Sequence, residues 1–416
     1  MAALLAWHDA VVRTAELVSL ADIEDARQRL ATVAVRTPLD RSRALSDLIG
    51  GEVFIKCENL QRTGSFKIRG AYNRISRLPT EESKCGVVAA SAGNHAQGTA
   101  LAASLNDIKS TVFMPTAAAL PKIEATKRYG AEVVLTGKDF GEAYEAAMGF
   151  SHDRGATFVH PFDHPHIIAG QGTCGLEILE QMPGVNTIVV PAGGGGLVSG
   201  IAAAAKSLRS DVRVVAVQAE GAAAFPASLE RGHPVTVEEM STIADGIACN
   251  TPGERTFAHV QALVDEVVTV TDEQIAEALV FTAERMKLVL EPAGAAGVAA
   301  GMLGLGNLKP PVVVVLSGGN IDPLLLLRVI RFGLSASGRY FAFRTRISDQ
   351  PGALHRLLGL LADLGANIVG VEHHREGVLA DLGDVEVALQ IETKGLEHIQ
   401  ELMTQLNATG YSVERL

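Results

Sequence analysis

Short apolar runs alternate with amphipathic stretches along most of this 416-residue chain. Runs without polar positions predict buried strands, and apolar residues three or four apart predict helices. The expected strands span residues 53–58, 86–90, 110–114, 131–136, 157–160, 187–191, 212–217 and 312–316. Strands without a polar face, separated by helices, indicate a parallel sheet that helices cover on both sides. The pattern therefore predicts the α/β class for the region between residues 19 and 332.

The two ends of the chain depart from this pattern. Residues 1–18 show no usable periodicity and are expected to form an N-terminal extension, after which Ser19 and Asp22 have the spacing of a capping box at a helix start. Residues 333–339 are small and polar enough for a linker. Residues 340–416 are expected to run strand–helix–strand–strand–helix–strand, the order of a ferredoxin-like α+β unit.

Composition argues against nucleic-acid and membrane partners. The formal net charge is −11, the pI is about 5.6 and aromatic residues make up 5%, whereas a nucleic-acid surface needs basic stripes and stacking rings. No apolar run approaches the ~20 residues that span a bilayer, and the first residues lack the basic start of a signal peptide. The four cysteines are scattered without a C-x-x-C pair, which predicts neither a zinc site nor disulfides. We expect a reducing, cytoplasmic location.

Lys67 is the first candidate for chemistry. It lies in residues 65–70, which follow an expected strand and a turn-like segment, so it falls in the first turn of a helix. Unpaired backbone N–H groups and the positive end of the helix dipole disfavour its protonated form. A neutral amine can attack a carbonyl carbon, so a Schiff base is the indicated use. On these residues alone, a solvated charge at a helix start remains the alternative.

Three loops follow expected strands, at the edge where parallel α/β sheets gather their ligands. Residues 91–97 combine small side chains with Asn94 at a helix N-terminus, which suits a carboxylate or an oxygen on a flat ring. Residues 193–196 are four glycines that begin a helix and leave backbone N–H groups free for a phosphate. Ser317 follows the strand at 312–316, and its hydroxyl suits a heterocyclic nitrogen.

Two interpretations of the glycine loop compete. A Rossmann-type dehydrogenase that binds NAD is one of them, because Glu220 follows the next strand. The glycines are contiguous, however, and not spaced as G-x-G-x-x-G, and NAD leaves Lys67 and Asn94 without a role. A phosphate cradle, an amine, an amide and a hydroxyl together indicate pyridoxal 5′-phosphate (PLP).

These motifs resemble those of the threonine ammonia-lyases (threonine dehydratases), which belong to the fold-type II PLP family. The resemblance rests on residues 65–71, 91–98, 160–163, 168–173, 193–197 and 317–320. It implies a PLP-dependent catalytic domain at 19–332, built from two open, mostly parallel α/β subdomains. The smaller subdomain is expected as an insertion over roughly residues 53–155.

The resemblance also implies a role for each motif. Lys67 carries the cofactor and takes the Cα proton of the substrate, and Phe66 adjoins it in the cofactor site. The ring oxygen binds Asn94, the ring nitrogen binds Ser317, and the phosphate binds Gly193, Gly194, Gly195, Gly196 and Leu197. The substrate carboxylate binds Ser91, Ala92, Gly93, Asn94 and His95. The implied reaction converts L-threonine to 2-oxobutanoate and ammonia, and L-serine to pyruvate.

Serine racemases and L-serine dehydratases share these cofactor motifs and remain alternatives. A racemase needs a second acid–base group, a serine at the position of Ala92, and a methyl group cannot move protons. The eukaryotic racemases also use a carboxylate pair for a divalent ion where this chain has Gln218 and Ala224. Both differences favour the dehydratase. No metal site is expected, because the histidines at 160, 164 and 166 are interrupted by prolines and lack helical ligand spacing.

Residues 340–416 resemble an ACT domain, an amino-acid-sensing module. The resemblance rests on residues 349–352 and 365–368, although relatives usually have arginine where this chain has Gln350. It implies regulation by isoleucine or valine, because 2-oxobutanoate feeds isoleucine synthesis. It also favours a homodimer or homotetramer, and a dimerisation domain that binds nothing is the alternative.

Overall fold

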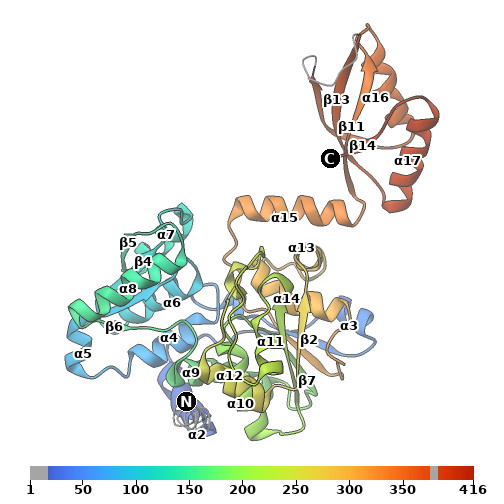
Figure 1. The fold of residues 1–416 in the computed structure, drawn as a ribbon. Coiled ribbons are helices and arrows are strands. Elements are labelled where there is room, and N and C mark those ends of the chain that lie inside the picture. The colour runs from blue at the N-terminus through green and yellow to red at the C-terminus, as the bar shows by residue number, and fades with distance from the viewer. Residues whose placement is uncertain (1–16, 375–382) are drawn as a thin grey trace. The chain divides into compact units, whose positions relative to one another are not determined.

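The computed structural model describes residues 17–374 and 383–416. The chain divides into two compact units, one up to Pro323 and one from Leu324 to Leu416 (Figure 1). Most of the predicted N-terminal extension, residues 1–16, therefore lies outside the described residues. Among the described residues, no helix is both long and apolar enough to cross a membrane.

The larger unit is built on a six-stranded sheet. In this sheet a strand from the beginning of the unit pairs with a strand from its end. In spatial order its strands are β1 (Leu39–Arg41), β2 (Val53–Lys56), β10 (Val312–Val315), β7 (Thr187–Pro191), β8 (Arg213–Ala219) and β9 (Glu266–Val270). All neighbours are parallel except β1, which is antiparallel to β2. Because β10 lies between β2 and β7, the loops that follow these three strands leave the sheet at the same edge.

A second sheet of four parallel strands forms the smaller subdomain of this unit. Its strands are β5 (Glu132–Leu135), β4 (Ser110–Met114), β3 (Val87–Ala90) and β6 (Thr157–Phe158). The predicted subdomain limits of roughly 53–155 need correction at both ends. β2 belongs to the six-stranded sheet because it pairs with β10 from a distant part of the sequence, and β6 extends the smaller sheet beyond residue 155.

Helices connect the strands, as predicted for the α/β class. They are α2 (Leu20–Leu30), α3 (Arg43–Ile49), α4 (Lys67–Ile75), α5 (Thr80–Cys85), α6 (Asn94–Ser104), α7 (Leu120–Arg128), α8 (Phe140–Arg154), α9 (Pro165–Gln181), α10 (Gly196–Leu208), α11 (Ala224–Arg231), α12 (Glu254–Leu263), α13 (Asp272–Phe281) and α14 (Pro292–Met302). The capping box predicted at Ser19 and Asp22 is confirmed at the start of α2.

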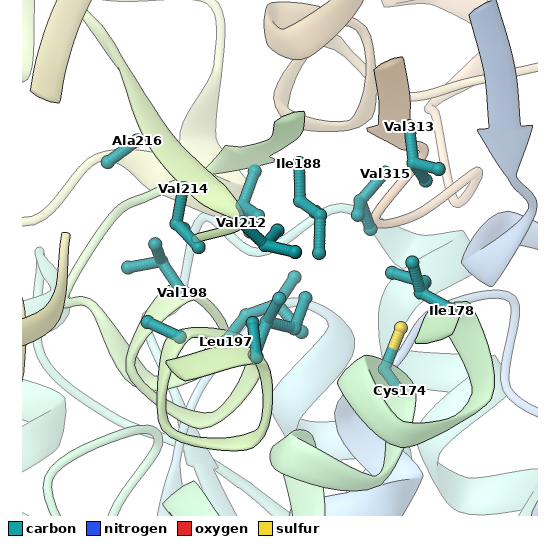
Figure 2. Close-up of a cluster of buried hydrophobic side chains, with 14 of the residues drawn as sticks. Cys174, Ile178, Ile188, Leu197, Val198, Val212, Val214, Ala216, Val313 and Val315 are labelled. Carbon is teal, nitrogen blue, oxygen red and sulfur yellow. The ribbon is translucent and has the colours of Figure 1, made fainter. Parts of the chain in front are cut away.

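The core of the larger unit lies between the six-stranded sheet and helices α9 and α10. Figure 2 shows strand valines such as Val214 and Val313 above Leu197 of α10 and Cys174 of α9. These side chains are almost completely buried. Leu197 therefore belongs to the core through its side chain and can contribute only its backbone to a site at the start of α10.

Glycines allow α9 to pack unusually close to α4 and α10. A Cβ on Gly170 of α9 would lie 2.6 Å from the carbonyl oxygen of Arg69 in α4. A Cβ on Gly200 of α10 would lie 2.4 Å from the carbonyl oxygen of Ile168 in α9. The obstructing atoms are backbone atoms, which cannot rotate away as a side chain can. The absence of side chains at these crossings thus sets the position of α4, and Lys67 with it.

The smaller unit has the predicted ferredoxin-like order. It contains α15 (Pro323–Ala336, with Pro323 on the other side of the boundary), β11 (Tyr340–Ser348), α16 (Ala353–Asp363), β12 (Asn367–His374), β13 (Asp384–Glu392), α17 (Leu396–Ala408) and β14 (Glu414–Arg415). The sheet is antiparallel in the order β12-β13-β11-β14. Buried side chains from both helices, such as Leu357 and Leu402, pack on Phe343 and Leu389 of the sheet.

The predicted linker is partly wrong. Residues 333–336 form the last turn of α15, because glycine, alanine and serine tolerate a helix that the preceding leucine-rich segment has already begun. Residues after this helix are also held in place, since the Thr393 hydroxyl donates to the Gly338 carbonyl oxygen at 2.6 Å.

Replacing Gly170 with alanine tests the close crossing of α4 and α9. We expect Gly170→Ala to lower the free energy of unfolding by about 1–3 kcal/mol, because the added methyl group meets rigid backbone. Gly149→Ala is the matched control, since Gly149 lies in α8 and a Cβ there has no atom within 4 Å; it should raise stability by about 0.5–1 kcal/mol. Urea unfolding of both variants measures the difference. Equal urea midpoints for the two variants would show that the close crossing of α4 and α9 does not contribute to stability.

Candidate active site

Lys67 begins α4, as predicted, and its amine points into the unit. Its Nζ donates to the carbonyl oxygen of Pro161 at 3.0 Å and lies 5.1 Å from the centroid of the Phe66 ring. Burial lowers the pKa of Lys67 to about 8, while the nearby Cys249 and Glu291 raise it. With an ordinary lysine pKa, only about one amine in three thousand would be neutral at pH 7; with a pKa near 8, about one in ten is neutral. The environment therefore favours a nucleophilic amine.

The loop after β10 pairs directly with the segment that carries Lys67. The Phe66 N–H donates to the Ser317 carbonyl oxygen at 3.2 Å, and the Gly319 N–H donates to the Gly64 carbonyl oxygen at 2.9 Å. Ser317 is buried, and its hydroxyl has no hydrogen-bond partner among the described residues. This pairing confirms that the loop after β10 and Lys67 meet, although about 250 residues separate them.

The helix that follows the loop after β3 also packs against Lys67. A Cβ on Gly98 of α6 would lie 3.1 Å from the Cβ of Lys67, so α6 packs directly on this residue. Ser91, Ala92, Gly93 and Asn94 are half-buried, and the Ser91 hydroxyl accepts the Gly93 N–H at 3.1 Å. The Asn94 side chain donates to Glu291 Oε1 at 2.6 Å and accepts from Asn320 Nδ2 at 2.8 Å.

The ring of His95 is buried against the backbone of Val159, the residue that follows β6. Its Nε2 lies 2.8 Å from the Val159 carbonyl oxygen, and its side chain is buried. Burial, with the charge of Lys67, lowers the pKa of His95 to about 3, so the ring is neutral near pH 7. The substrate role predicted for this residue is therefore limited to its backbone N–H at the start of α6.

The glycine loop packs against Phe162, and the adjacent residue, Pro161, accepts the hydrogen bond from Lys67. Any Cβ on Gly194 or Gly196 would collide with Phe162, which follows the Pro161 that accepts the lysine hydrogen bond. Gly195 has φ +93° and begins α10, a conformation that favours glycine. The N–H groups of residues 193–195 have no acceptor among the described residues. These N–H groups and the positive end of the α10 dipole have the chemistry that suits an anion.

The short helix η3 (Asp245–Ile247) contacts both the glycine loop and Glu291. A Cβ on Gly193 would lie 2.8 Å from the Cα of Ile247, and a Cβ on Gly246 would lie 3.5 Å from Glu291 Oε1. Asp245 also forms an ion pair at 2.6 Å with Lys122 of α7, so it connects the two subdomains. The lysine, the glycine loop, Asn94 and the loop at Ser317 are thus joined through neighbouring residues into one site.

Glu291, Asn320 and Cys249 also lie near these groups, and the sequence predicts no role for them. Glu291 is buried, which raises its pKa to about 7; Asp245 adds to the rise, and Asn94, Lys122 and Lys67 oppose it. The signal for Glu291 is a carboxylate directly before Pro292 at a helix start. Cys249 follows no motif, and only the fold brings it close enough to Lys67 to affect its pKa.

The histidine-rich segment uses its ring nitrogens to hold the backbone. His160 Nδ1 accepts the Asp163 N–H at 2.7 Å, and His164 Nδ1 accepts the His166 N–H at 3.1 Å where α9 begins. Among the residues that the structure describes, no cluster of three or more histidine, cysteine or acidic side chains could hold a metal ion.

A buried network of four charges supports the helix that carries Lys67. Arg69 of α4 donates to both oxygens of Glu58, each at 2.8 Å, and to both oxygens of Glu177 in α9, at 2.7 and 3.0 Å. Lys56 at the end of β2 donates to Glu177 at 2.6 Å and to the Thr37 carbonyl oxygen at 2.9 Å. Two positive and two negative charges balance each other away from water.

Within this network, Arg69 and Glu58 hold each other in their ionised forms. Burial by itself would raise the pKa of Glu58, but Arg69, Lys56 and the Thr37 hydroxyl lower it below its ordinary value. Because the folded state keeps Glu58 charged, this group stabilises the fold above its unfolded pKa. That stability is lost as the pH falls through the lowered value.

Arg69→Met should expose the importance of this network. Removing one buried charge leaves its partners uncompensated, which costs about 3–5 kcal/mol of unfolding free energy. The control is Arg27→Ala, which removes a pair with Glu180 whose side chains are about half exposed and should cost at most about 1 kcal/mol. Urea unfolding compares the two. Similar losses in both variants would show that the buried network is no more important than a surface pair.

Two family models match the chain. A model described as pyridoxal-phosphate dependent enzyme matches residues 7–318, and an ACT domain model matches residues 343–409. The chain is 50% identical over 397 residues to L-threonine ammonia-lyase of Thermotoga maritima, a match that covers 95% of this chain and 99% of that relative.

Solved structures agree with these matches. The processed form of threonine deaminase isoform 2 from Solanum lycopersicum superposes with a TM-score of 0.72 and 39% identity, over 75% of this chain and 86% of that one. Maize serine racemase superposes with a TM-score of 0.72 and 35% identity, over 77% of this chain and 98% of the other. This chain therefore belongs to the family of pyridoxal-phosphate dependent enzymes and carries a C-terminal ACT domain.

Proposed function

We propose that this protein is a PLP-dependent threonine ammonia-lyase, a carbon–nitrogen lyase that converts L-threonine to 2-oxobutanoate and ammonia and accepts L-serine as well. The observation that carries the proposal is that neighbouring residues bring the Lys67 amine, the glycine loop, Asn94 and Ser317 together in one region of the fold. The Thermotoga maritima relative supports the choice of substrate through its name and its match over nearly the whole chain.

The residues present fit PLP. The free N–H groups of residues 193–195, with those of Gly196 and Leu197 in the first turn of α10, suit its phosphate. The amine of Lys67, beside Phe66, suits its aldehyde. The unpartnered hydroxyl of Ser317 suits its ring nitrogen, and Asn94 suits its ring oxygen. We assign these residues to the cofactor site.

The protein supplies a base and an anchor for the substrate. PLP, when bound, acts as an electron sink that makes the Cα proton of an amino acid acidic. Lys67 has the lowered pKa that a general base needs near neutral pH. The backbone N–H groups of Asn94 and His95 at the start of α6, with the Ser91 loop, provide a helix N-terminus for the substrate carboxylate.

Serine racemase is the second candidate, because the maize racemase has a closely similar structure. Ala92 lies in the substrate loop and offers no group that could move a proton. Gln218 Oε1 accepts the Phe225 N–H at 2.9 Å, so this amide serves the backbone at α11. Both observations favour the lyase over the racemase.

Measuring 2-oxobutanoate tests the proposed activity. Purified protein should release 2-oxobutanoate from L-threonine, and Lys67→Ala should lose at least about a thousandfold in rate, because it lacks both the attachment point and the base. Gly149→Ala, far from the site along α8, serves as the control variant. Formation of D-serine from L-serine without pyruvate would support the racemase and contradict our assignment.

We further propose that the ACT unit binds isoleucine or valine and that the protein forms a homodimer or homotetramer. A cavity in this unit is lined by Arg346, Arg356, Asp384 and Tyr411, among others. Neither arginine forms an ion pair with another described residue. Guanidinium groups suit the carboxylate of an amino acid, and Asp384 suits its ammonium group. Arg356 would thus supply the positive charge that Gln350 lacks.

Isothermal titration tests this regulation. Isoleucine should bind with measurable heat and change the threonine kinetics, and Arg356→Ala should weaken binding about tenfold or more through loss of a charge-assisted hydrogen bond. Glycine, which has no side chain, is the ligand control. If isoleucine and valine give no heat and no kinetic change, the proposed effectors are wrong, and the ACT unit serves another purpose.

A further inference from the structure

Three polar side chains form a directed chain of hydrogen bonds along one side of the site. Asn320 Nδ2 donates to the Thr63 carbonyl oxygen at 2.6 Å and to Asn94 Oδ1 at 2.8 Å. Asn94 Nδ2 in turn donates to Glu291 Oε1 at 2.6 Å. The chain therefore runs from a backbone carbonyl to a buried carboxyl group, with Asn94 in the middle.

The first acceptor of this chain decides the orientation of both amides. A backbone carbonyl oxygen can only accept, so Asn320 must present its NH2 group to Thr63. The same NH2 group donates to Asn94, which must therefore accept with its side-chain carbonyl oxygen. The NH2 group of Asn94 then lies on the opposite end, toward Glu291. Rotating either amide by half a turn would bring two donors or two acceptors together.

Glu291 is well placed to hold the other end of Asn94. Its backbone N–H donates to the Gly318 carbonyl oxygen at 3.2 Å, and a Cβ on Gly318 would lie 2.1 Å from its Oε1. The carboxyl group thus occupies space that a side chain at Gly318 would fill. An oxygen of Glu291 can accept from Asn94 whether the group is ionised or protonated, so the orientation holds on both sides of its titration.

Gly64, in the segment before Lys67, leaves space for the side chain of Asn320 in the same way. Gly64 has φ +70°, and a Cβ there would lie 2.4 Å from Asn320 Oδ1. The segment before Lys67 and the loop after β10 therefore leave space for both partners of Asn94. These contacts are specific features of the site and not incidental surface hydrogen bonds.

We propose that Asn320 and Glu291 are positioning residues that orient the Asn94 amide so that its NH2 group, and not its carbonyl oxygen, serves the cofactor. One N–H of this group goes to Glu291, and the second remains for the ring oxygen of PLP. The inference rests on the proposed function, which assigns Asn94 to that oxygen. A donor stabilises negative charge on the ring oxygen, whereas a carbonyl oxygen at the same place would repel it.

The experiment compares variants of the holoprotein that differ in how they can orient Asn94. Asn320→Asp cannot donate to Asn94 and should turn its amide around, and Asn94→Asp removes the donor itself. Glu291→Gln keeps an oxygen acceptor for Asn94 and should preserve the orientation. Asn367→Ala is the matched control, because it removes an asparagine–carboxylate hydrogen bond to Glu392 in the smaller unit.

Two quantities are measured: the dissociation constant of PLP, and the ratio of visible to near-ultraviolet absorbance of the bound cofactor. We expect Asn320→Asp and Asn94→Asp to weaken PLP binding about tenfold, the scale of one hydrogen bond to a charged group, and to lower the absorbance ratio. Asn367→Ala should stay within about twofold of the natural protein in both quantities, and Glu291→Gln should change the absorbance ratio less than Asn320→Asp does. The absorbance ratio reports the environment of the ring oxygen, which a purely structural role would not change.

The outcomes separate this inference from the proposed function. If the natural protein binds no PLP, the proposed function fails and the inference fails with it. If the natural protein and Asn320→Asp bind PLP with the same absorbance ratio while Asn94→Asp differs, the inference alone is overturned. Should Asn320→Asp fail to fold, Asn320→Ala removes the same donor, and an absorbance ratio equal to that of the natural protein would overturn the inference as well.

Discussion

The ion network of Lys56, Glu58, Arg69 and Glu177 is the interaction on which the site most depends. It connects β2, α4 and α9 next to Lys67, since Arg69 lies only two positions after Lys67. Buried charges are costly unless each is matched, so the network tolerates few other arrangements of these elements. It therefore stabilises the position of α4 against the six-stranded sheet, and this fixes the position of Lys67, the first residue of α4.

Glycines contribute the second constraint by letting backbones approach where side chains would keep them apart. Gly170 brings α9 against α4, and the glycines at 194 and 196 lie against Phe162 beside the carbonyl group that Lys67 contacts. Close approach brings the glycine loop, with its free backbone N–H groups, near the segment that the Lys67 amine contacts, and burial lowers the pKa of this amine. The fold thus brings together segments more than 100 residues apart in the sequence.

Much of this site could be predicted from the sequence, because each of its motifs is a short continuous segment. Lys67 at a helix start, the glycines before α10 and Ser317 after β10 each follow a strand, and the structure places all three as expected. The pairing of β2 with β10 was not predictable from periodicity, which is why the smaller subdomain was given the wrong limits. The helical turn at 333–336 was missed because small residues signal flexibility in isolation.

The contacts that the sequence did not reveal join distant residues by hydrogen bonds. Asn94 and Glu291 are 197 positions apart, and Asn94 and Asn320 are 226 apart. No local pattern records such a partnership, and a buried carboxyl group before a proline looks like an ordinary helix start. Only the three-dimensional arrangement shows that Glu291 and Lys67 affect each other's pKa.

Chemical trapping shows directly whether the Lys67 amine carries PLP, as we propose. Borohydride reduction of the holoprotein, followed by proteolysis and mass mapping, locates the lysine that is bonded to the cofactor. We expect one modified peptide, with the added mass on Lys67. Modification at another lysine, or protein that carries no reducible cofactor after incubation with PLP, would contradict it.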